Sequence, residues 1–270
     1  RTAIQRSCDV YFYEVARLLG VDRLSETAKK FGLGKTVLDG FIEERSGVVP
    51  NTSWKKKFIG KNWYLSETLH SGIGQGYYQS TPLQLCLMTA QLANGGFELK
   101  PRLLVNEEKN NLREFIKYKN DNPNDPLPLD MLVSNFNLKP LFRNQENINF
   151  VKDAMFASTN EPGGTSYRSR LKDKKFIFAG KTGSSQVKRF TEAQREAEIK
   201  QSELDYKDRD HALYIAFAPY ENPKYSISVV IEHGGSGSSS AAPIAKKVIK
   251  KVLERHEIRM AQSNNIGEEI

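Results

Sequence analysis

The sequence predicts an α+β fold in which an antiparallel sheet is flanked by helices. The predicted helices come first in the chain, whereas the alternating apolar pattern of strands comes late, at residues 211–220 and 225–232. The short link 219–224 between these two segments predicts that they pair as an antiparallel hairpin. With 39% hydrophobic and 27% charged residues among 270, the composition is that of a globular protein and excludes a disordered or fibrous chain.

Two helices and a long loop region are expected at the start of the chain. Asp9 as N-cap and Gly20 as a stop predict a helix over residues 10–19. A second helix is expected over residues 22–31. Recurring glycine and proline predict mainly loops over residues 33–70.

The middle of the chain predicts one strong helix and two surface insertions. Thr81 as cap and Pro82 at the first helical position predict a helix that reaches Ala93. Residues 106–147 are polar and rich in Asn, Lys and Asp, which indicates a surface insertion. Residues 189–209 are densely charged and are interpreted as a second insertion, partly helical over 192–200.

A further strand and a final helix complete the predicted elements. The strand is expected over residues 175–187, interrupted at Gly180 and Gly183. The helix is expected over 241–256, followed by a flexible tail at 257–270. Its predicted buried residues are Ile244, Val248, Ile249 and Val252, and its predicted exposed residues are Lys246, Lys247, Lys250 and Lys251.

Charge, cysteines and apolar runs restrict the class of protein. The net charge of +8 favours anionic surroundings. Cys8 and Cys86 are too few for a disulfide scaffold or an all-cysteine zinc site. No apolar run approaches the about 18 residues that span a membrane. Because the first residues lack an initiator Met and a signal-peptide pattern, we expect the chain to be part of a longer protein.

Several apparent motifs favour ordinary structural roles. The glycines at 72–76 lack the spacing of a dinucleotide-binding loop. The lysines at 55–57 are interpreted as a solvated loop, and no basic–aromatic pattern indicates nucleic-acid binding. Neighbouring residues on a strand point to opposite faces, so the pairs 210–211 and 232–233 are not acid–histidine dyads.

The most informative segment is residues 179–187. Lys181 supplies a cation, Thr182 and Ser184 supply hydroxyls, and Gly183 leaves room for a ligand backbone beside the strand. These groups suit a carboxylate and an amide. The competing interpretation is a bulged strand with a surface lysine.

The motif set S-x-x-K, S-D-N and K-T-G belongs to serine β-lactamases and penicillin-binding proteins. Residues 181–183 match the third motif, and Ser7-Cys8-Asp9 matches the second, with Asp where most relatives carry Asn. Further agreement comes from GIGQGY (72–77), STPLQ (80–84), ANGG (93–96), GGT (163–165), FAPY (217–220) and EHGGSGS (232–238). The chain therefore resembles the transpeptidase domain of class B penicillin-binding proteins, most closely the penicillin-binding protein 2 group of the rod-elongation system. The resemblance implies a serine β-lactamase/transpeptidase-like fold over residues 1–256.

The resemblance also implies a nucleophilic S-x-x-K upstream of Ser7. Two segments fit that pattern, Ser53-x-x-Lys56 and Ser185-x-x-Lys188. The first is expected in a loop and follows the second motif, which is the wrong order. The second is expected on a strand, where alternation separates its two side chains. Both are rejected, so we expect a sheet that is incomplete at its N-terminal side and a chain that is inactive alone.

By resemblance, each motif residue has a catalytic or binding role. Ser7 shuttles a proton beside Lys181, and Asp9 orients this pair or contacts the peptide. The Ser184 N–H forms half of the oxyanion hole. The residues expected to bind the substrate are Thr182, Gly183, Ser184 and Ser185.

The implied activity is a serine-type D-Ala-D-Ala transpeptidase that crosslinks peptidoglycan stem peptides and is a target of β-lactam antibiotics. The implied partners are a SEDS-type glycosyltransferase and other elongation-complex proteins, on the periplasmic side of the inner membrane, with an N-terminal anchor. No cofactor and no nucleic acid are expected. Cys8 is interpreted as a small buried residue, with a metal ligand as the alternative. The alternative functions are a serine carboxypeptidase or β-lactamase, and a non-catalytic binding protein of the same fold.

Overall fold

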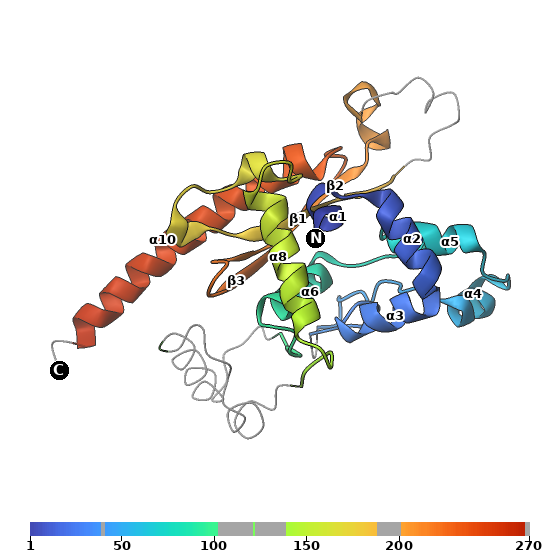
Figure 1. Ribbon diagram of the computed structural model, residues 1–270, viewed down its shortest axis with the longest axis horizontal. Helices are drawn as coiled ribbons and strands as arrows, with labels where there is room; N and C mark the ends of the chain where they lie inside the picture. The colour runs from blue at the N-terminus through green and yellow to red at the C-terminus, as the bar shows by residue number, and fades with distance from the viewer. Residues whose placement is uncertain (39–40, 102–120, 122–138, 188–200, 268–270) are drawn as a thin grey trace. The chain divides into compact units, whose positions relative to one another are not determined.

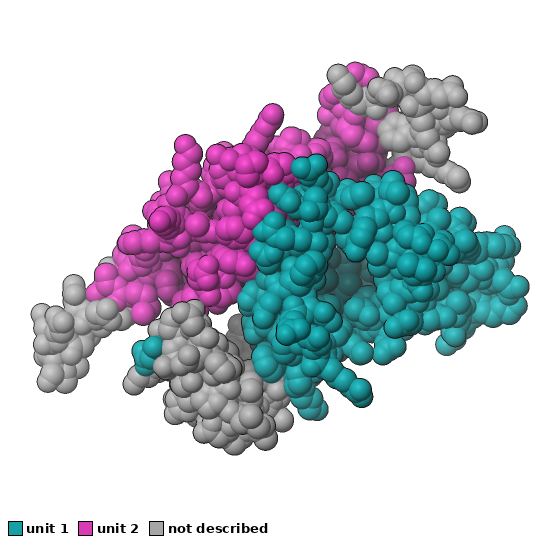
Figure 2. All heavy atoms as spheres, viewed as in Figure 1, with its two compact units in different colours: residues 1–154 teal, residues 155–270 magenta. Residues whose placement is uncertain are grey.

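The computed structural model describes residues 1–38, 41–101, 121, 139–187 and 201–267. Most of the predicted insertion at 106–147 lies outside these residues, as does the helix expected at 192–200. The chain forms two compact units, Arg1–Ala154 and Met155–Ile270 (Figure 2). Among the helices that the structure describes, none is long and apolar enough to cross a membrane.

Unit 1 is helical (Figure 1). Its helices include α1 (Thr2–Arg6), α2 (Asp9–Leu19), α3 (Val21–Lys30), α4 (Thr52–Ile59), α5 (Leu65–Gly72) and α6 (Pro82–Ala93), and α8 (Glu146–Asn160) continues into unit 2. The structure confirms the predicted helices that correspond to α2, α3 and α6. Helices α4 and α5 contradict the loops expected over 33–70. Asn51 begins α4 as its N-cap residue, because its side chain accepts the Trp54 N–H at 2.7 Å.

The start of α2 differs by one residue from the prediction. Cys8 is the N-cap residue and Asp9 is the first helical residue, so Asp9 is not the cap. The carboxylate of Asp9 lies in the first turn, where the partial positive charge of the helix N-terminus favours it.

Helices α2 and α5 pack closely at Gly72. A Cβ on this glycine would lie 2.5 Å from Ala16 Cβ and 2.9 Å from the Phe12 carbonyl oxygen. Glycine is therefore needed for helix packing here, which supports the rejection of a dinucleotide-binding loop.

Helix α6 holds the preceding loops through a buried glutamine. The Thr81 hydroxyl accepts the Gln84 N–H at 3.2 Å, and Gln84 Oε1 accepts the Thr81 N–H at 3.0 Å, which forms a capping box. Gln84 Nε2 donates to the carbonyls of Lys35 and Ser46 at 2.7 and 2.8 Å.

Lys55 contradicts the prediction of a solvated loop at 55–57. Its side chain is only 2% exposed and its ammonium binds both carboxylate oxygens of Glu67. The ammonium also lies 4.5 Å from the ring centre of Tyr64 and about 6 Å from those of Trp63 and Tyr77. Burial alone would raise the pKa of Glu67, but hydrogen bonds from Lys55, Tyr64 and Tyr77 and the charge of Lys55 lower this pKa below its usual value.

Unit 2 is built on a three-stranded antiparallel sheet in the order β1-β2-β3 (Figure 1). The strands are β1 (Ala179–Ser185), β2 (His211–Ala218) and β3 (Tyr225–Ile231). The predicted β2–β3 hairpin is confirmed. The predicted interruption of β1 is wrong, because every residue from Ala179 to Ser185 pairs one-for-one with Phe217 to His211.

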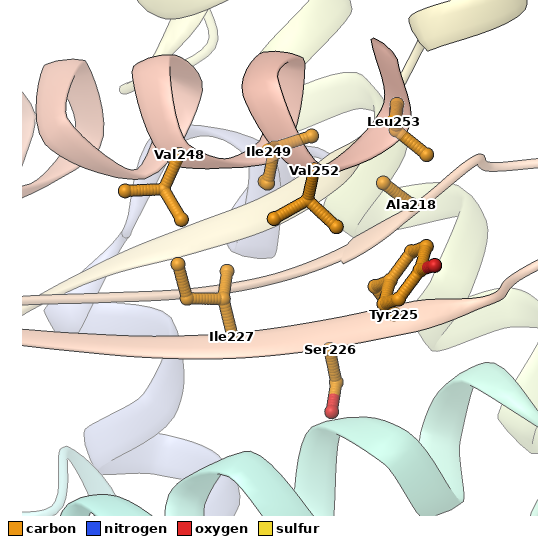
Figure 3. Close-up of a pocket in the computed structure, with 8 residues that line it drawn as sticks. All are labelled: Ala218, Tyr225, Ser226, Ile227, Val248, Ile249, Val252 and Leu253. Carbon is orange, nitrogen blue, oxygen red and sulfur yellow. The ribbon is translucent and has the colours of Figure 1, made fainter. Parts of the chain in front are cut away.

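Helix α10 (Ala242–Gly267) packs on the sheet, and the predicted buried face is partly confirmed: Ile249 is buried and Val252 is half-buried. Ala242, Ala245, Ile249 and Leu253 belong to the buried core of the sheet, whereas Ile244 and Val248 are 41% and 42% exposed. Val248 and Val252 face Ile227 and Tyr225 of β3, around a small apolar cavity of about 150 Å³ (Figure 3). The helix extends past His256 to Gly267, across much of the predicted tail.

Candidate active site

The predicted site residues fall in both units. Ser7, Cys8 and Asp9 lie in unit 1, at the junction of α1 and α2, and Lys181–Ser185 lie on β1 in unit 2. Ser7 ends α1 in the left-handed conformation, with φ 53° and ψ 57°. Such a conformation is uncommon for a residue other than glycine and occurs frequently at functional sites.

Cys8 and Asp9 are both exposed, so the interpretation of Cys8 as a buried residue is wrong. The turn between α1 and α2 brings both side chains to the surface. In the part of the chain that the structure describes, no group of three or more His, Cys, Asp and Glu side chains is placed to hold a metal ion.

Strand β1 offers an open edge. Within the described residues it pairs with β2 on one side and with no strand on the other. Lys181 and Thr182 are half-buried, and the three residues from Gly183 to Ser185 are exposed. A Cβ on Gly183 would have Leu213 Cβ, at 3.4 Å, as its nearest neighbour, so the glycine does not fill a tight space. An unpaired strand edge can bind an extended peptide through main-chain hydrogen bonds.

Lys181 and Thr182 form the polar part of this edge. Lys181 Nζ donates to the Thr182 carbonyl at 2.9 Å and to Thr182 Oγ1 at 3.2 Å. Thr182 Oγ1 also lies 3.0 Å from Thr165 Oγ1, which lies 3.2 Å from Ser158 Oγ on α8. Because Lys181 donates to Thr182, the hydroxyl hydrogen of Thr182 remains for Thr165 or for a bound carboxylate.

A buried network of hydroxyls anchors the first half of β1. Thr159 Oγ1 accepts the Gly180 N–H at 3.0 Å and lies 3.0 Å from the Tyr214 hydroxyl, which donates to Ser166 Oγ at 3.1 Å. Tyr214 is fully buried, and burial raises the pKa of its phenol to about 12, so the hydroxyl stays neutral.

Gly180 permits this arrangement. A Cβ at this position would lie 2.6 Å from Tyr214 Cζ and 2.7 Å from the Ile215 carbonyl oxygen. The tyrosine ring therefore occupies the space that any other residue would fill, and the glycine of the AGKTG segment is a packing requirement.

Sequence reasoning missed the supporting residues Ser158, Thr159, Ser166 and Tyr214. Thr165 was visible only as part of the GGT segment at 163–165, to which no role was assigned. Their function depends on contacts between residues up to 55 positions apart. A hydroxyl residue in an otherwise apolar helix end or strand is the only local signal.

The two rejected S-x-x-K segments are placed differently from the expectation. Ser53 lies on α4 and not in a loop, so the positional part of its rejection is wrong, although it still follows Ser7-Cys8-Asp9 in the chain. Ser185 is the exposed last residue of β1, and Lys188 lies outside the described residues.

Comparison with known proteins identifies the family of the chain. The family model described as penicillin binding protein transpeptidase domain matches residues 1–250. The peptidoglycan D,D-transpeptidase MrdA of Salmonella typhimurium is 34% identical over 252 residues, covering 93% of this chain and 37% of the relative. The corresponding protein of Haemophilus influenzae is 33% identical over 274 residues, covering 99% of this chain and 39% of the relative. The chain thus spans well under half the length of these relatives.

Two solved structures are also similar. The penicillin-binding protein PBP2 of Helicobacter pylori, in complex with MreC, has a TM-score of 0.72 and 30% identity, covering 94% of this chain and 39% of that chain. PBP2 of Pseudomonas aeruginosa, in complex with WCK 5153, has a TM-score of 0.69 and 33% identity, covering 92% and 48%. With sequence, fold and the Lys-Thr-Gly strand in agreement, this chain belongs to the transpeptidase-domain family of class B penicillin-binding proteins, of the penicillin-binding protein 2 type.

Proposed function

We propose that the full-length protein is a serine-type D,D-transpeptidase that crosslinks the stem peptides of peptidoglycan and is acylated by β-lactams. The single observation that carries this proposal is the Lys181–Ser185 edge of β1, an open strand with a cation and hydroxyls beside it. The names of the related proteins support the same reaction.

The proposed substrate is an extended peptide with a C-terminal carboxylate. Its backbone pairs with the free edge of β1, and its carboxylate binds the Lys181 cation and the hydroxyls of Thr182 and Ser184. Gly183 leaves the strand surface clear, and Ser185 lines the end of the binding edge.

The proposed reaction is acyl transfer in two steps. A serine oxygen attacks the carbonyl of the penultimate D-alanine, the C–N bond breaks, and the terminal D-alanine leaves as an amine after it gains a proton. The amine of a second stem peptide then attacks the ester, and the serine regains its proton. The Ser184 N–H stabilises the oxyanion, Ser7 and Lys181 move the proton to the leaving group, and Asp9 orients them or binds peptide.

We place the attacking serine in a part of the full-length protein outside these residues. The related proteins are much longer than this chain. Neither Ser53 nor Ser185 precedes the Ser7-Cys8-Asp9 motif, as the nucleophilic serine of the family is expected to do. We therefore expect residues 1–270 alone to remain unlabelled by a fluorescent penicillin.

The proposed setting is the periplasmic side of a bacterial inner membrane, within the elongation complex. The Helicobacter pylori relative was solved with MreC, which supports partners of that complex. A SEDS-type glycosyltransferase partner and an N-terminal membrane anchor belong to the same proposal and rest on the family resemblance.

Substitution of Lys181 tests the proposal. In the full-length protein, Lys181→Ala should slow acylation by a fluorescent penicillin by about 10² or more, because it removes a charge at the reacting centre. The matched control is Lys172→Ala, which removes an exposed lysine nearby in the chain. Near-normal acylation of Lys181→Ala would remove Lys181 from the mechanism. Fast hydrolysis of the acyl-enzyme would favour a β-lactamase or carboxypeptidase, and absence of labelling of the parent would favour a non-catalytic binding protein.

A further inference from the structure

Asp210, the residue before β2, connects three segments at the exposed end of β1. Its Oδ1 accepts the Val187 N–H at 3.1 Å, just beyond the last β1–β2 pair, Ser185–His211. The carboxylate thereby extends the ladder of hydrogen bonds that holds β1. It does so with a side chain, at a point where the main-chain pairing has ended.

Gln201 holds Asp210 in this orientation. Gln201 Nε2 donates to Asp210 Oδ2 at 2.9 Å, and Gln201 Oε1 accepts the Asp210 N–H at 2.8 Å. The two residues form a reciprocal pair. One carboxylate oxygen of Asp210 is therefore held by Gln201, and the other holds Val187, two residues beyond the end of β1.

The glycine-rich turn, residues 232–238 after β3, is hydrogen-bonded to Asp210 as well. The Asp210 carbonyl accepts the Gly235 N–H at 2.8 Å. The neighbouring His211 accepts the His233 N–H through Nδ1 at 2.9 Å, and His233, at φ 53°, has its own Nδ1 3.1 Å from the Arg209 carbonyl oxygen. These contacts agree with a structural interpretation of both histidines.

This turn lies directly on the glycine of the Lys-Thr-Gly triplet. A Cβ on Gly237 would lie 2.6 Å from the Gly183 carbonyl oxygen and 3.1 Å from its nitrogen, and would collide with the Leu213 carbonyl oxygen. The turn therefore forms the wall behind Gly183. Any displacement of Gly235 and its neighbours changes the support of the strand that binds the substrate.

We propose that Asp210 is a positioning residue for the active site: with Gln201 it joins the end of β1 to the glycine-rich turn, and so holds Gly183 and Ser184 in register for acyl transfer. The proposal rests on the proposed function and assigns Asp210 no contact with the substrate. Its effect should appear in the acylation step, where small displacements of the oxyanion donor are costly, more than in reversible binding.

The experiment measures acylation of the full-length protein by a chromogenic or fluorescent penicillin, with the first-order acylation rate separated from the reversible binding constant. Asp210→Ala should lower the acylation rate about tenfold, as expected for loss of alignment, with the binding constant changed about twofold or less. Asp205→Ala is the matched control, because Asp205 is an exposed aspartate five positions earlier, outside the pair. It should leave both constants unchanged.

Exchanging the carboxylate of Asp210 and the amide of Gln201 between the two positions tests the hydrogen-bond pattern. Asp210→Asn alone keeps the acceptor for Val187 but opposes an N–H to the Gln201 N–H. Adding Gln201→Glu replaces that donor with an acceptor, so all three hydrogen bonds can form again. The single Asp210→Asn variant should be slow, and the double variant should recover most of the parent rate. This comparison needs only a polar substitution, so it remains informative if Asp210→Ala fails to fold.

Parent-like acylation of Asp210→Ala or Asp210→Asn, or no recovery in the double variant, would overturn the positioning role. A drop in thermal stability with an unchanged acylation rate would also overturn it, because the residue would then be merely structural. Failure of the proposed function is a separate result: the parent itself would not be acylated.

Discussion

The buried ion pair of Lys55 and Glu67 should show an asymmetric response to substitution. Glu67→Ala leaves an ammonium whose side chain is 2% exposed without its carboxylate. Removal of one partner of a buried pair typically costs about 3–5 kcal/mol. Lys55→Met leaves a carboxylate that is 18% exposed and still accepts the Tyr64 N–H at 2.8 Å and the Tyr77 hydroxyl at 3.3 Å. We expect that variant to lose only about 1–3 kcal/mol.

The assay is thermal unfolding of the full-length protein and its variants. At about 2–4 °C per kcal/mol for a domain of this size, Glu67→Ala should lower the unfolding midpoint by about 6–20 °C, and Lys55→Met by clearly less. Lys56→Met is the matched control, because Lys56 is the exposed neighbour on α4, and it should change stability by less than about 0.5 kcal/mol. The double variant Lys55→Met with Glu67→Met should be more stable than Glu67→Ala, since no buried charge then lacks a partner.

Equal and small losses of stability in the two single variants would contradict a buried, charge-paired Lys55. That result would mean that the ammonium is solvated, as the sequence alone suggested. A larger loss in Lys55→Met than in Glu67→Ala would also contradict the prediction, because the carboxylate without its cation would then be the more costly of the two unpaired charges.

Three further predictions concern pH, the hydroxyl network and the glycine-rich turn. Burial alone would raise the pKa of Glu67, but its hydrogen bonds and the Lys55 charge lower this pKa below 4.5. The stability that the ionised carboxylate contributes is therefore present above pH 4.5 and is lost as the pH falls through the folded-state pKa. Glu67→Gln should make the unfolding midpoint less dependent on pH between pH 5 and about pH 2, measured by thermal unfolding. Tyr214→Phe should destabilise the protein by about 1–2 kcal/mol, measured by thermal unfolding, since Thr159 and Ser166 keep other partners. Gly237→Ala should slow penicillin acylation at least about tenfold, because the new methyl group collides with main-chain atoms of Gly183, whereas Ser239→Ala, directly after the same turn, should acylate like the parent.

Several elements of the fold were predicted correctly because the interactions that form them join residues close together in the sequence. The cap, proline and glutamine at 81–84 form a capping box within one turn of α6, so the start of that helix is encoded by four adjacent positions. The hairpin of β2 and β3 follows from two alternating segments and a short link. The Lys-Thr-Gly triplet on a strand followed from apolar residues directly before it.

Errors arose where neighbours distant in sequence decide the environment. Lys55 belongs to a run of three lysines, yet only Lys55 meets Glu67 and the surrounding rings. The buried face of α10 was predicted only in part: Ile249 is buried as expected, but the small residues Ala242 and Ala245 and the more distant Leu253 complete the buried face. Ile244 and Val248, the more apolar residues, remain partly exposed.

For the candidate site, the sequence by itself determined the chemical groups: the Lys181 cation, the hydroxyls beside it and the open glycine. Only the tertiary structure decided how these groups are held, because their supports come from Thr159 and Thr165, beside Gly180 and Thr182, and from Asp210, beyond the end of β1. Hydrogen bonds of this kind join segments that are separated by tens of residues. No periodicity or local motif encodes such contacts, since they exist only once the sheet, α8 and the glycine-rich turn have packed together.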